Sequence, residues 1–296
     1  MYIAIEWTSA AFHAWQMQPD GTVVAECQSD AGVNSVQGGA FETALRLQIG
    51  DWLPQARAIL LSGMVTSRTG WVESPFAMVP AGLPDLLAQA TRRDLDGLPP
   101  LYFLPGVARL EPLPDVMRGE ELAILGIEGT LPELVILPGA HSKWVRTDGR
   151  QIVDLTTYMS GEILNLLRKD SLVSRLIPAG YTPNEHAFAR GVDIARDKAA
   201  LPGGVLQRVF SARSLVLFDR LPQTDIADYL AGLVIGSEIF EALSGRAQPD
   251  TIAVLGETPV ADQYRRALAM FGIASPPSSG NTVNAFARLI ATFGAA

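Results

Sequence analysis

Residues 133–159 read ELVILPGAHSKWVRTDGRQIVDLTTYM, and their order decides how the rest of the chain is interpreted. An apolar run leads into a turn of small and polar residues, and a second apolar run carries a tryptophan. An Asp-Gly reversal then leads into a third run. This pattern predicts three strands joined by two tight turns.

The same order occurs at residues 2–28, which read YIAIEWTSAAFHAWQMQPDGTVVAECQ. A tryptophan precedes an Asp-Gly pair in both segments, Trp15 in the first and Trp144 in the second. The two segments match in pattern and not in letters, and hairpins are common. From the pattern alone, an internal duplication and a coincidence of two hairpins both stay open.

Helical and strand patterns alternate along the rest of the chain. Strands are expected at 56–63, 101–106 and 250–256, and helices at 41–53, 83–93, 117–127, 161–170, 184–198, 225–244, 259–271 and 282–293. The two prolines of EPLPDV (111–116) predict a crossover between domains. We therefore expect two α/β domains, 1–114 and 115–296, that face a central cleft.

Composition excludes several classes of function. The 296 residues are 48% hydrophobic, and the net charge is −8 without any basic block, which disfavours a nucleic-acid partner. No apolar run approaches the about 20 residues of a membrane span, and the N-terminus shows no signal-peptide pattern, so a cytoplasmic protein is expected. A single cysteine and three histidines make an internal disulfide impossible and a zinc cluster improbable.

The second turn, PGAHSKW (138–144), is the strongest candidate site. Its glycine lets the backbone approach a ligand, and His141, Ser142 and Lys143 add donors and a positive charge suited to phosphate. An ordinary hairpin with solvated polar residues would also explain it. The first turn has Glu6 and hydroxyl residues at its mouth, so two such turns could hold a polyphosphate.

A second candidate is the start of the helix expected at 117–127, where Arg118, Glu120 and Glu121 lie together. The helix dipole alone can explain carboxylates there. Alternatively, one glutamate accepts the proton of a substrate hydroxyl during phosphoryl transfer, with Arg118 nearby for an acidic substrate. The hydroxyl-rich loop 62–71 contributes Ser67 and Arg68, either as ligands of a polyol or carboxylate or as a plain surface loop.

Three weaker candidates lie further along. Ser160 and Glu162 open a helix, and capping alone accounts for them. Gly232 and Gly236 are four residues apart on a helix, which permits close packing or the approach of a flat ligand. VLGETP (254–259) joins a strand to a helix N-terminus, where an anion or a nucleotide edge could bind.

Taken together, these segments resemble the 2-keto-3-deoxy-galactonate kinases, which are part of the actin-like, hexokinase-type ATPase superfamily. The segments that carry the resemblance are YIAIEW…AW, LSGMVTSRTGW, DVMRGEELAILG, LPGAHSKWV, YMSGEILNLL, AGLVIGSEI and VLGETPVADQYRRAL. The resemblance implies two ribonuclease-H-like domains with a duplicated core of three strands and a helix. It also implies transfer of the γ-phosphate of ATP to the 6-hydroxyl of a six-carbon keto-deoxy sugar acid, with Mg²⁺. A homodimer is a further expectation.

The resemblance also implies roles for single residues. Glu120 would be the general base, by analogy with glycerol-kinase-like relatives, and Glu6 would contact Mg²⁺ through water. The residues implied for the ATP phosphates are Glu6, Thr8, Ser9, Gly139, His141, Ser142 and Lys143. Those implied for the adenosine side are Gly232, Gly236, Gly256 and Thr258, and those for the sugar acid are Ser67, Arg68 and Arg118. Domain 1–114 would carry the first turn and the sugar-acid loop, and domain 115–296 the base, the second turn and the adenosine side.

The first turn departs from the Asp-Trp-Gly pattern of that family. Glu6 stands where Asp is usual, Thr8 where Gly is usual, and His13 where Arg is usual, with Ala11 among the hydroxyl positions. A β-branched residue at a position that needs positive φ would be strained by about 1–3 kcal/mol. A second function therefore stays open, that of a catalytically weakened homologue that binds a sugar acid or nucleotide as a sensor or scaffold.

Overall fold

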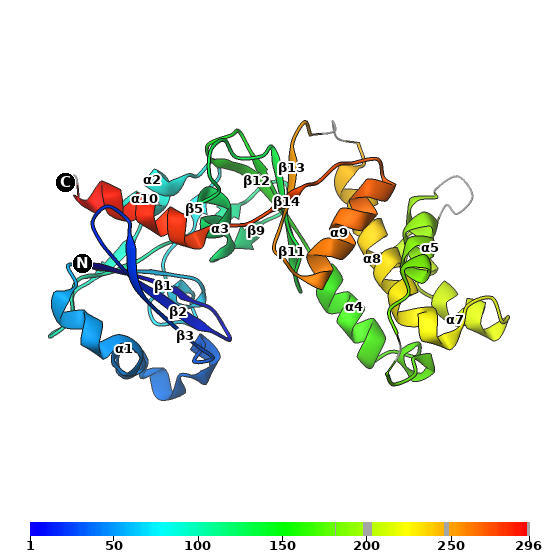
Figure 1. Ribbon diagram of the computed structural model, residues 1–296, viewed down its shortest axis with the longest axis horizontal. Coiled ribbons are helices and arrows are strands. Elements are labelled where there is room, and N and C mark those ends of the chain that lie inside the picture. The colour runs from blue at the N-terminus through cyan, green and yellow to red at the C-terminus, as the bar shows by residue number, and fades with distance from the viewer. Residues whose placement is uncertain (181, 198–202, 246–248, 295–296) are drawn as a thin grey trace. The chain divides into compact units, whose positions relative to one another are not determined.

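The computed structural model describes residues 1–180, 182–197, 203–245 and 249–294 (Figure 1). The chain divides into two compact units. Unit 1 comprises Met1–Pro132, Val145–Leu155 and Ser279–Ala296, and unit 2 comprises Glu133–Trp144 and Thr156–Ser278.

The centre of unit 1 is a six-stranded sheet in the order β3-β2-β1-β4-β7-β6. Its strands are β1 (Tyr2–Trp7), β2 (Phe12–Met17), β3 (Val23–Ser29), β4 (Ile59–Ser62), β6 (Thr91–Arg93) and β7 (Leu101–Phe103). The strands β1, β4 and β7 run parallel, while β2 is antiparallel to both β1 and β3. The central strands are buried almost throughout, which explains their continuous apolar runs.

Helices cover both faces of this sheet. On one face, α1 (Phe41–Ile49) packs its apolar side on the sheet, and the Phe41 ring lies 5.7 Å from that of Trp7. On the other face lies α10 (Thr282–Gly294), whose Phe286 and Phe293 rings approach those of Trp15 and Tyr102. The short helices α2 (Leu83–Ala88) and α3 (Glu120–Leu125) both contact α10.

A small sheet completes unit 1. It consists of β5 (Ala77–Met78), β8 (Val107–Arg109) and β9 (Asp115–Met117), with β8 and β9 antiparallel. The proline-rich segment 111–116 therefore lies mainly in the turn of a hairpin and is not a crossover between domains. The boundary expected at 114/115 does not coincide with a division between the two units, because the hairpin and the α3 that follows it both belong to unit 1, and the chain leaves this unit after Pro132.

The second sheet has five strands in the order β12-β11-β10-β13-β14. They are β10 (Leu134–Leu137), β11 (Ser142–Thr147), β12 (Ile152–Tyr158), β13 (Ile252–Leu255) and β14 (Pro277–Ser278). The strands β10, β13 and β14 are parallel. This order repeats that of β3-β2-β1-β4-β7, including the parallel partners of the first strand, so the duplicated three-strand pattern is confirmed as a repeat of topology.

The helices of unit 2 are α4 (Ser160–Lys169), α5 (Glu185–Arg196), α6 (Val205–Arg208), α7 (Ser211–Leu217), α8 (Ile226–Leu243) and α9 (Pro259–Met270). The helix α8 is buried along most of its length and packs beside α5 (Figure 1). The expected helices 161–170, 184–198, 225–244 and 259–271 correspond to α4, α5, α8 and α9, although position 198 lies outside the described residues. The sequence did not predict β5, β6, β8, β9, β14, α6 or α7.

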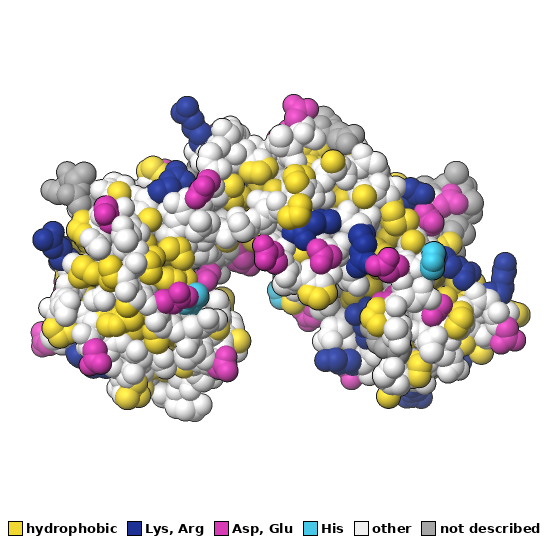
Figure 2. Space-filling view, viewed as in Figure 1, with side chains coloured by type: hydrophobic (Ala, Val, Ile, Leu, Met, Phe, Trp, Pro, Cys, Tyr) yellow, Lys and Arg dark blue, Asp and Glu magenta, His cyan; other side chains and the backbone are white. Residues whose placement is uncertain are grey.

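Among the described residues, no helix is long and apolar enough to cross a membrane. On the face shown in Figure 2, Lys and Arg side chains are interspersed with Asp and Glu and form no continuous basic patch. This distribution agrees with the net charge of −8.

Candidate functional site

The turn between β1 and β2 is closed by the side chain of Thr8. Its Oγ1 accepts from the Ala11 amide at 3.0 Å, and the Thr8 amide donates to the Ala11 carbonyl at 2.9 Å. Thr8 is not among the residues with positive φ. The strain that a threonine would suffer at a glycine position is therefore absent, and the hydroxyl of Thr8 replaces part of the turn's hydrogen bonding.

The segment 32–34 packs against this turn and hydrogen-bonds its carbonyls. The Thr8 and Ser9 carbonyls accept from the amides of Val33 and Asn34 at 2.9 and 3.1 Å. A Cβ on Gly32 would overlap the Ser9 carbonyl, so only glycine fits there. With these carbonyls bonded inside the protein, the turn has a fixed backbone.

Two carboxylates lie close together near this turn. Glu6 stands at the end of β1, opposite His13 of β2. Burial raises the pKa of Glu6, the nearby His13 lowers it, and the charge of Glu120 raises it again. Glu120 is the first residue of α3, and its Oε2 accepts from the Arg118 amide at 2.9 Å. The structure thus brings together the predicted metal ligand and the predicted base.

Glu121 has no exposed surface, and both of its carboxylate oxygens accept from the Gly119 amide, at 2.9 and 2.7 Å. Burial, followed by the charge of Glu120, raises the pKa of Glu121 to about 8. The sequence showed two adjacent glutamates without distinguishing them. The structure does distinguish them, because Glu120 is partly exposed and Glu121 is not.

Arg118 holds the loop that was expected to bind the sugar acid. Its guanidinium donates to the carbonyl and the Oγ1 of Thr66, at 2.6 and 2.7 Å, and to the Ser74 carbonyl at 3.0 Å. It also lies over the Phe76 ring, 4.2 Å from the centroid. The structure therefore uses Arg118 to fasten the loop to the start of α3, which leaves it fewer donors for a substrate.

The other two residues implied for the sugar acid lie on this loop. The Ser67 hydroxyl donates to the Met64 carbonyl at 2.7 Å. Arg68 is 86% exposed and pairs with Glu73 at 3.3 Å, an exposed ion pair of little energetic weight. Of the two side chains, that of Arg68 has more freedom to turn toward an anionic substrate.

The turn between β10 and β11 is supported in the same manner as the first. The Ala140 carbonyl accepts from the Glu162 amide at 2.9 Å, as the Ser9 carbonyl does from Asn34. A Cβ on Gly161 would overlap the Gly139 carbonyl, whereas one on Gly139 would meet open space. The glycine that this packing requires is thus Gly161, and Gly139 has room beside it for a ligand.

The three polar residues of the second turn differ in accessibility. His141 is exposed, and its Nε2 lies 2.5 Å from Oε2 of Glu162. Lys143 is only 8% exposed, and its Nζ donates to Oγ1 of Thr157 at 3.0 Å. Ser142 is fully buried, so its predicted direct contact with phosphate is not supported by this structure. Only His141 presents its side chain openly.

A pocket of about 670 Å³ opens beside this turn, within the 300–1,000 Å³ of small-molecule sites. It lies wholly in unit 2, between the second turn, α4, α8 and the start of α9. Its lining consists of Pro138, Gly139, Ala140, His141, Ser160, Gly161, Glu162, Leu164, Asn165, Arg168, Ile235, Thr258, Val260, Gln263 and Tyr264. The predicted residues Gly139, His141 and Thr258 are thereby brought to one site.

The other glycines expected on the adenosine side lie elsewhere. Gly232 and Gly236 face α5, where a Cβ on either would overlap α5 atoms, so they serve the close packing of two helices. Ile235, from the same helix, lines the pocket in their place. Gly256 ends β13 with φ +99°, and Arg265 donates to its carbonyl, but it is not part of the pocket lining.

Sequence reasoning also missed Glu238, a carboxylate inside the apolar helix α8. It is 3% exposed and accepts hydrogen bonds from Trp144 and Tyr264. The available signal was one acidic residue amid the apolar residues of AGLVIGSEI. A buried carboxylate is costly unless it is hydrogen-bonded, so such a residue indicates partners elsewhere in the fold.

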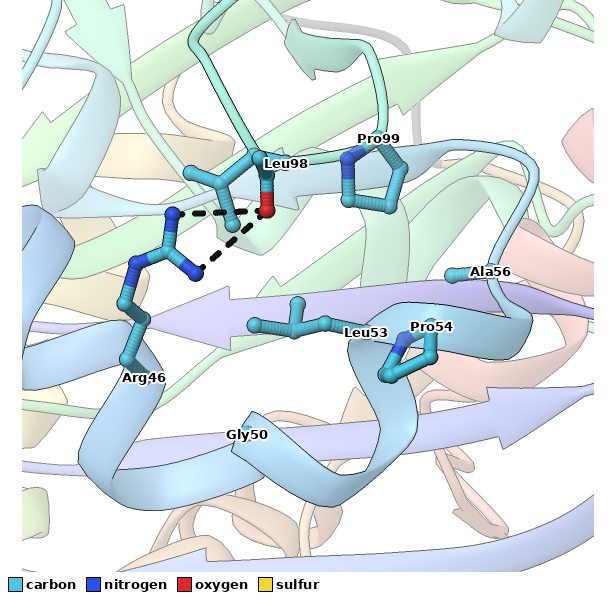
Figure 3. A pocket seen from close by; sticks show the side chains of 8 residues that line it. Arg46, Gly50, Leu53, Pro54, Ala56, Leu98 and Pro99 are labelled. Atoms are coloured by element: carbon cyan, nitrogen blue, oxygen red, sulfur yellow. Dashed lines mark hydrogen bonds between the residues drawn. The ribbon is translucent and has the colours of Figure 1, made fainter.

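A second hollow, of about 510 Å³, lies in unit 1 before the strands β4 and β7 begin (Figure 3). Arg46 reaches across it and donates to the Gly97 carbonyl at 3.4 and 3.3 Å. This hollow lies at the opposite end of the parallel strands from Glu6. Ligands of such sheets bind at the carboxyl ends of the strands, so we assign no function to it.

Among the described residues, no group of three or more His, Cys, Asp or Glu side chains could hold a metal ion. The remaining candidate is Glu6, a single carboxylate. Mg²⁺ in phosphoryl-transfer sites is commonly held by one or two carboxylates together with waters and substrate phosphates. The residues present therefore fit a magnesium ion bound mainly through the nucleotide.

Comparison with known proteins gives consistent results. The family described as 2-keto-3-deoxy-galactonokinase matches residues 6–288. A 2-dehydro-3-deoxygalactonokinase of Escherichia coli (strain K12) is 30% identical over 95% of this chain and 94% of its own length. A candidate enzyme of that name from Rhizobium meliloti (strain 1021) is 31% identical over 92% of this chain and 90% of its own.

Two solved structures are similar to this chain in fold. A candidate 2-dehydro-3-deoxygalactonokinase from Sinorhizobium meliloti superposes with a TM-score of 0.86 at 28% identity, covering 100% of this chain and 98% of its own. A candidate N-acetylglucosamine kinase from Porphyromonas gingivalis has a TM-score of 0.51 at 15% identity, covering 99% of both chains, and so shares the fold alone. The predicted α/β fold with a duplicated three-strand core is confirmed by the two sheets, and the Sinorhizobium meliloti structure shares this fold over the whole chain.

Proposed function

Because the chain belongs to the 2-keto-3-deoxy-galactonokinase family and is therefore a sugar-acid kinase, we propose that it transfers the γ-phosphate of ATP to the 6-hydroxyl of 2-keto-3-deoxy-galactonate or a close sugar acid. Mg²⁺, when bound, would neutralise charge on the phosphates, with Glu6 contacting it through water.

The observation that carries this proposal is the pair of adjacent glutamates at the start of α3. Phosphoryl transfer needs one carboxylate that can reach the attacking hydroxyl. Glu120 is partly exposed and held by the Arg118 amide, whereas Glu121 is fully buried. Glu120 is therefore the general base that accepts the proton of the 6-hydroxyl as its oxygen bonds to phosphorus.

The residues expected to bind the sugar acid belong to unit 1, and the pocket beside the second turn belongs to unit 2. In unit 1, the loop that carries Ser67 and Arg68 would bind the sugar acid, and Arg118 would hold that loop in place. In unit 2, the pocket beside the second turn would bind the nucleotide. Gly139 and His141 would lie at its phosphate end, and Thr258 at the start of α9.

The proposal is tested by coupled measurement of ADP release with Mg-ATP and 2-keto-3-deoxy-galactonate, with the epimeric 2-keto-3-deoxy-gluconate as a stereochemical control. We expect turnover with the galactonate derivative and a loss of at least about 100-fold in kcat for Glu120→Gln, since general bases contribute about 10²–10⁴-fold. An unaffected kcat for Glu120→Gln would remove this residue from the role of base.

The same assay separates the enzyme from the sensor or scaffold alternative. Sugar-acid binding by calorimetry without any ADP release would support the alternative. The absence of strain at Thr8 weakens the main sequence argument for a degenerate first turn.

A further inference from the structure

Glu238 lies behind the pocket of unit 2 and collects donors from several elements. Its Oε1 accepts from Nε1 of Trp144 on β11, and its Oε2 from the hydroxyl of Tyr264 on α9, both at 2.6 Å. Burial raises the pKa of Glu238, whereas hydrogen bonds with Ser160, Tyr264, Trp144 and Ser142 lower it. Four polar side chains thus converge on one carboxyl group, which can act only as an acceptor when ionised.

These side chains surround the second turn. Ser142 is the first residue of β11, directly after the turn, and its hydroxyl lies 2.7 Å from that of Tyr264. Ser160 is the first residue of α4, directly before Gly161, which packs on the turn's backbone. A single side chain thus ties together the strand that leaves the turn, the helix that supports it and the helix that lines the pocket.

The network also reaches the pocket surface. Ser160 and Tyr264 both line the pocket, and Ile235 lines it one helical turn before Glu238 on α8. Glu238 is therefore linked both to the pocket wall and to the turn by one hydrogen-bond network.

We propose that Glu238 is a positioning residue that holds the second turn and the wall of the unit 2 pocket in the arrangement that binds the nucleotide. The inference rests on the proposed function in taking this pocket as the nucleotide site. Glu238 touches no substrate itself and acts through Ser142, Ser160 and Tyr264.

The decisive variant is Glu238→Gln, which preserves volume but places an amide in the network. Trp144 can only donate through its indole nitrogen, so the amide oxygen must face it. The amide nitrogen then faces Tyr264, whose hydroxyl can no longer donate there and must reorient. We expect the dissociation constant for fluorescently labelled ADP and the KM for ATP to rise about tenfold. The KM for the sugar acid should stay within a factor of two.

A matched pair of tyrosine variants separates positioning from mere stability. Tyr264→Phe removes the buried hydroxyl that donates to Glu238 and lies 2.7 Å from that of Ser142. Tyr229→Phe removes a buried hydroxyl of the same unit that bonds Ser211 at 2.5 Å, away from the pocket. Both should lower the midpoint of thermal unfolding, but only Tyr264→Phe should weaken nucleotide binding.

The outcomes are distinguishable. Wild-type protein that neither binds labelled ADP nor releases ADP would overturn the proposed function and this inference with it. Wild-type protein that binds and turns over, with equal nucleotide affinity in all three variants, would overturn the inference alone. Equal increases in the KM for ATP and the KM for the sugar acid in Glu238→Gln would likewise refute a role specific to the nucleotide.

Discussion

Glu121 offers a direct test of the electrostatics at the start of α3. It has no exposed surface, its oxygens accept from the Gly119 amide, and the charge of Glu120 lies beside it. Burial is the main reason that its pKa rises from 4.5 to about 8. Near neutral pH, Glu121 therefore keeps its proton in the folded protein and loses it in the unfolded chain.

The sign of the effect follows from this difference. Below about pH 4.5, both states hold the proton, and the stabilising contribution of neutral Glu121 is fully present. As pH rises toward 8, the unfolded chain releases the proton first, so the free energy of unfolding decreases. A shift from 4.5 to about 8 corresponds to about 5 kcal/mol, at about 1.4 kcal/mol for each unit. This contribution is lost by the time the pH exceeds 8.

The variant Glu121→Gln stays neutral at every pH and can still accept from the Gly119 amide. We expect urea unfolding at pH 5, 6, 7 and 8 to show that the variant gains several kcal/mol relative to wild type over this range. Glu120→Gln serves as the control, and it should keep most of the wild-type pH dependence because burial is the first cause of the shift. Parallel stability curves for wild type and Glu121→Gln would refute the reasoning.

Three further predictions concern the loops around the site. In Arg118→Lys, the lysine cannot make all three hydrogen bonds to Thr66 and Ser74. The KM for the sugar acid should therefore rise about tenfold while the KM for ATP stays unchanged. Equal changes in both KM values would contradict this. Gly161→Ala should lower the free energy of unfolding, measured by urea unfolding, by about 1–3 kcal/mol. Gly139→Ala should lower it far less, because the added methyl group meets open space. Equal losses would contradict the role of Gly161 in packing on the second turn. Thr8→Val removes the hydroxyl that closes the first turn and should lower the free energy of unfolding by about 1 kcal/mol in the same assay. An unchanged midpoint of urea unfolding would show that the turn does not need this hydroxyl.

Much of the fold could be predicted because its main signals are local. The three-strand pattern depends on apolar runs and on Asp-Gly reversals, which act over a few residues. The domain boundary could not be found in this manner. The prolines of 111–116 indicate a break in regular structure, but whether that break is a hairpin turn or a linker depends on the pairing of β8 with β9. The chain also returns to unit 1 through α10, which only long-range packing determines.

The candidate site was harder to predict, because residue type does not determine exposure. Ser142 has the chemistry of a phosphate ligand but is buried against Tyr264. Gly232 and Gly236 suit either a ligand or a neighbouring helix, and the position of α5 decides between them. Glu238 was passed over because its hydrogen-bond partners come from β11, α4 and α9, which are distant in sequence.

The glycine missing from the first turn is explained by what the turn packs against. The carbonyls of this turn face a neighbouring segment, and carbonyls inside a protein need donors and room. In the first turn, the donors are the amides of Val33 and Asn34, and Gly32 provides the room. In the second turn, Glu162 and Gly161 do the same. The residue that cannot carry a side chain is thus in the supporting segment, so Thr8 can occupy the turn and close it with its own hydroxyl.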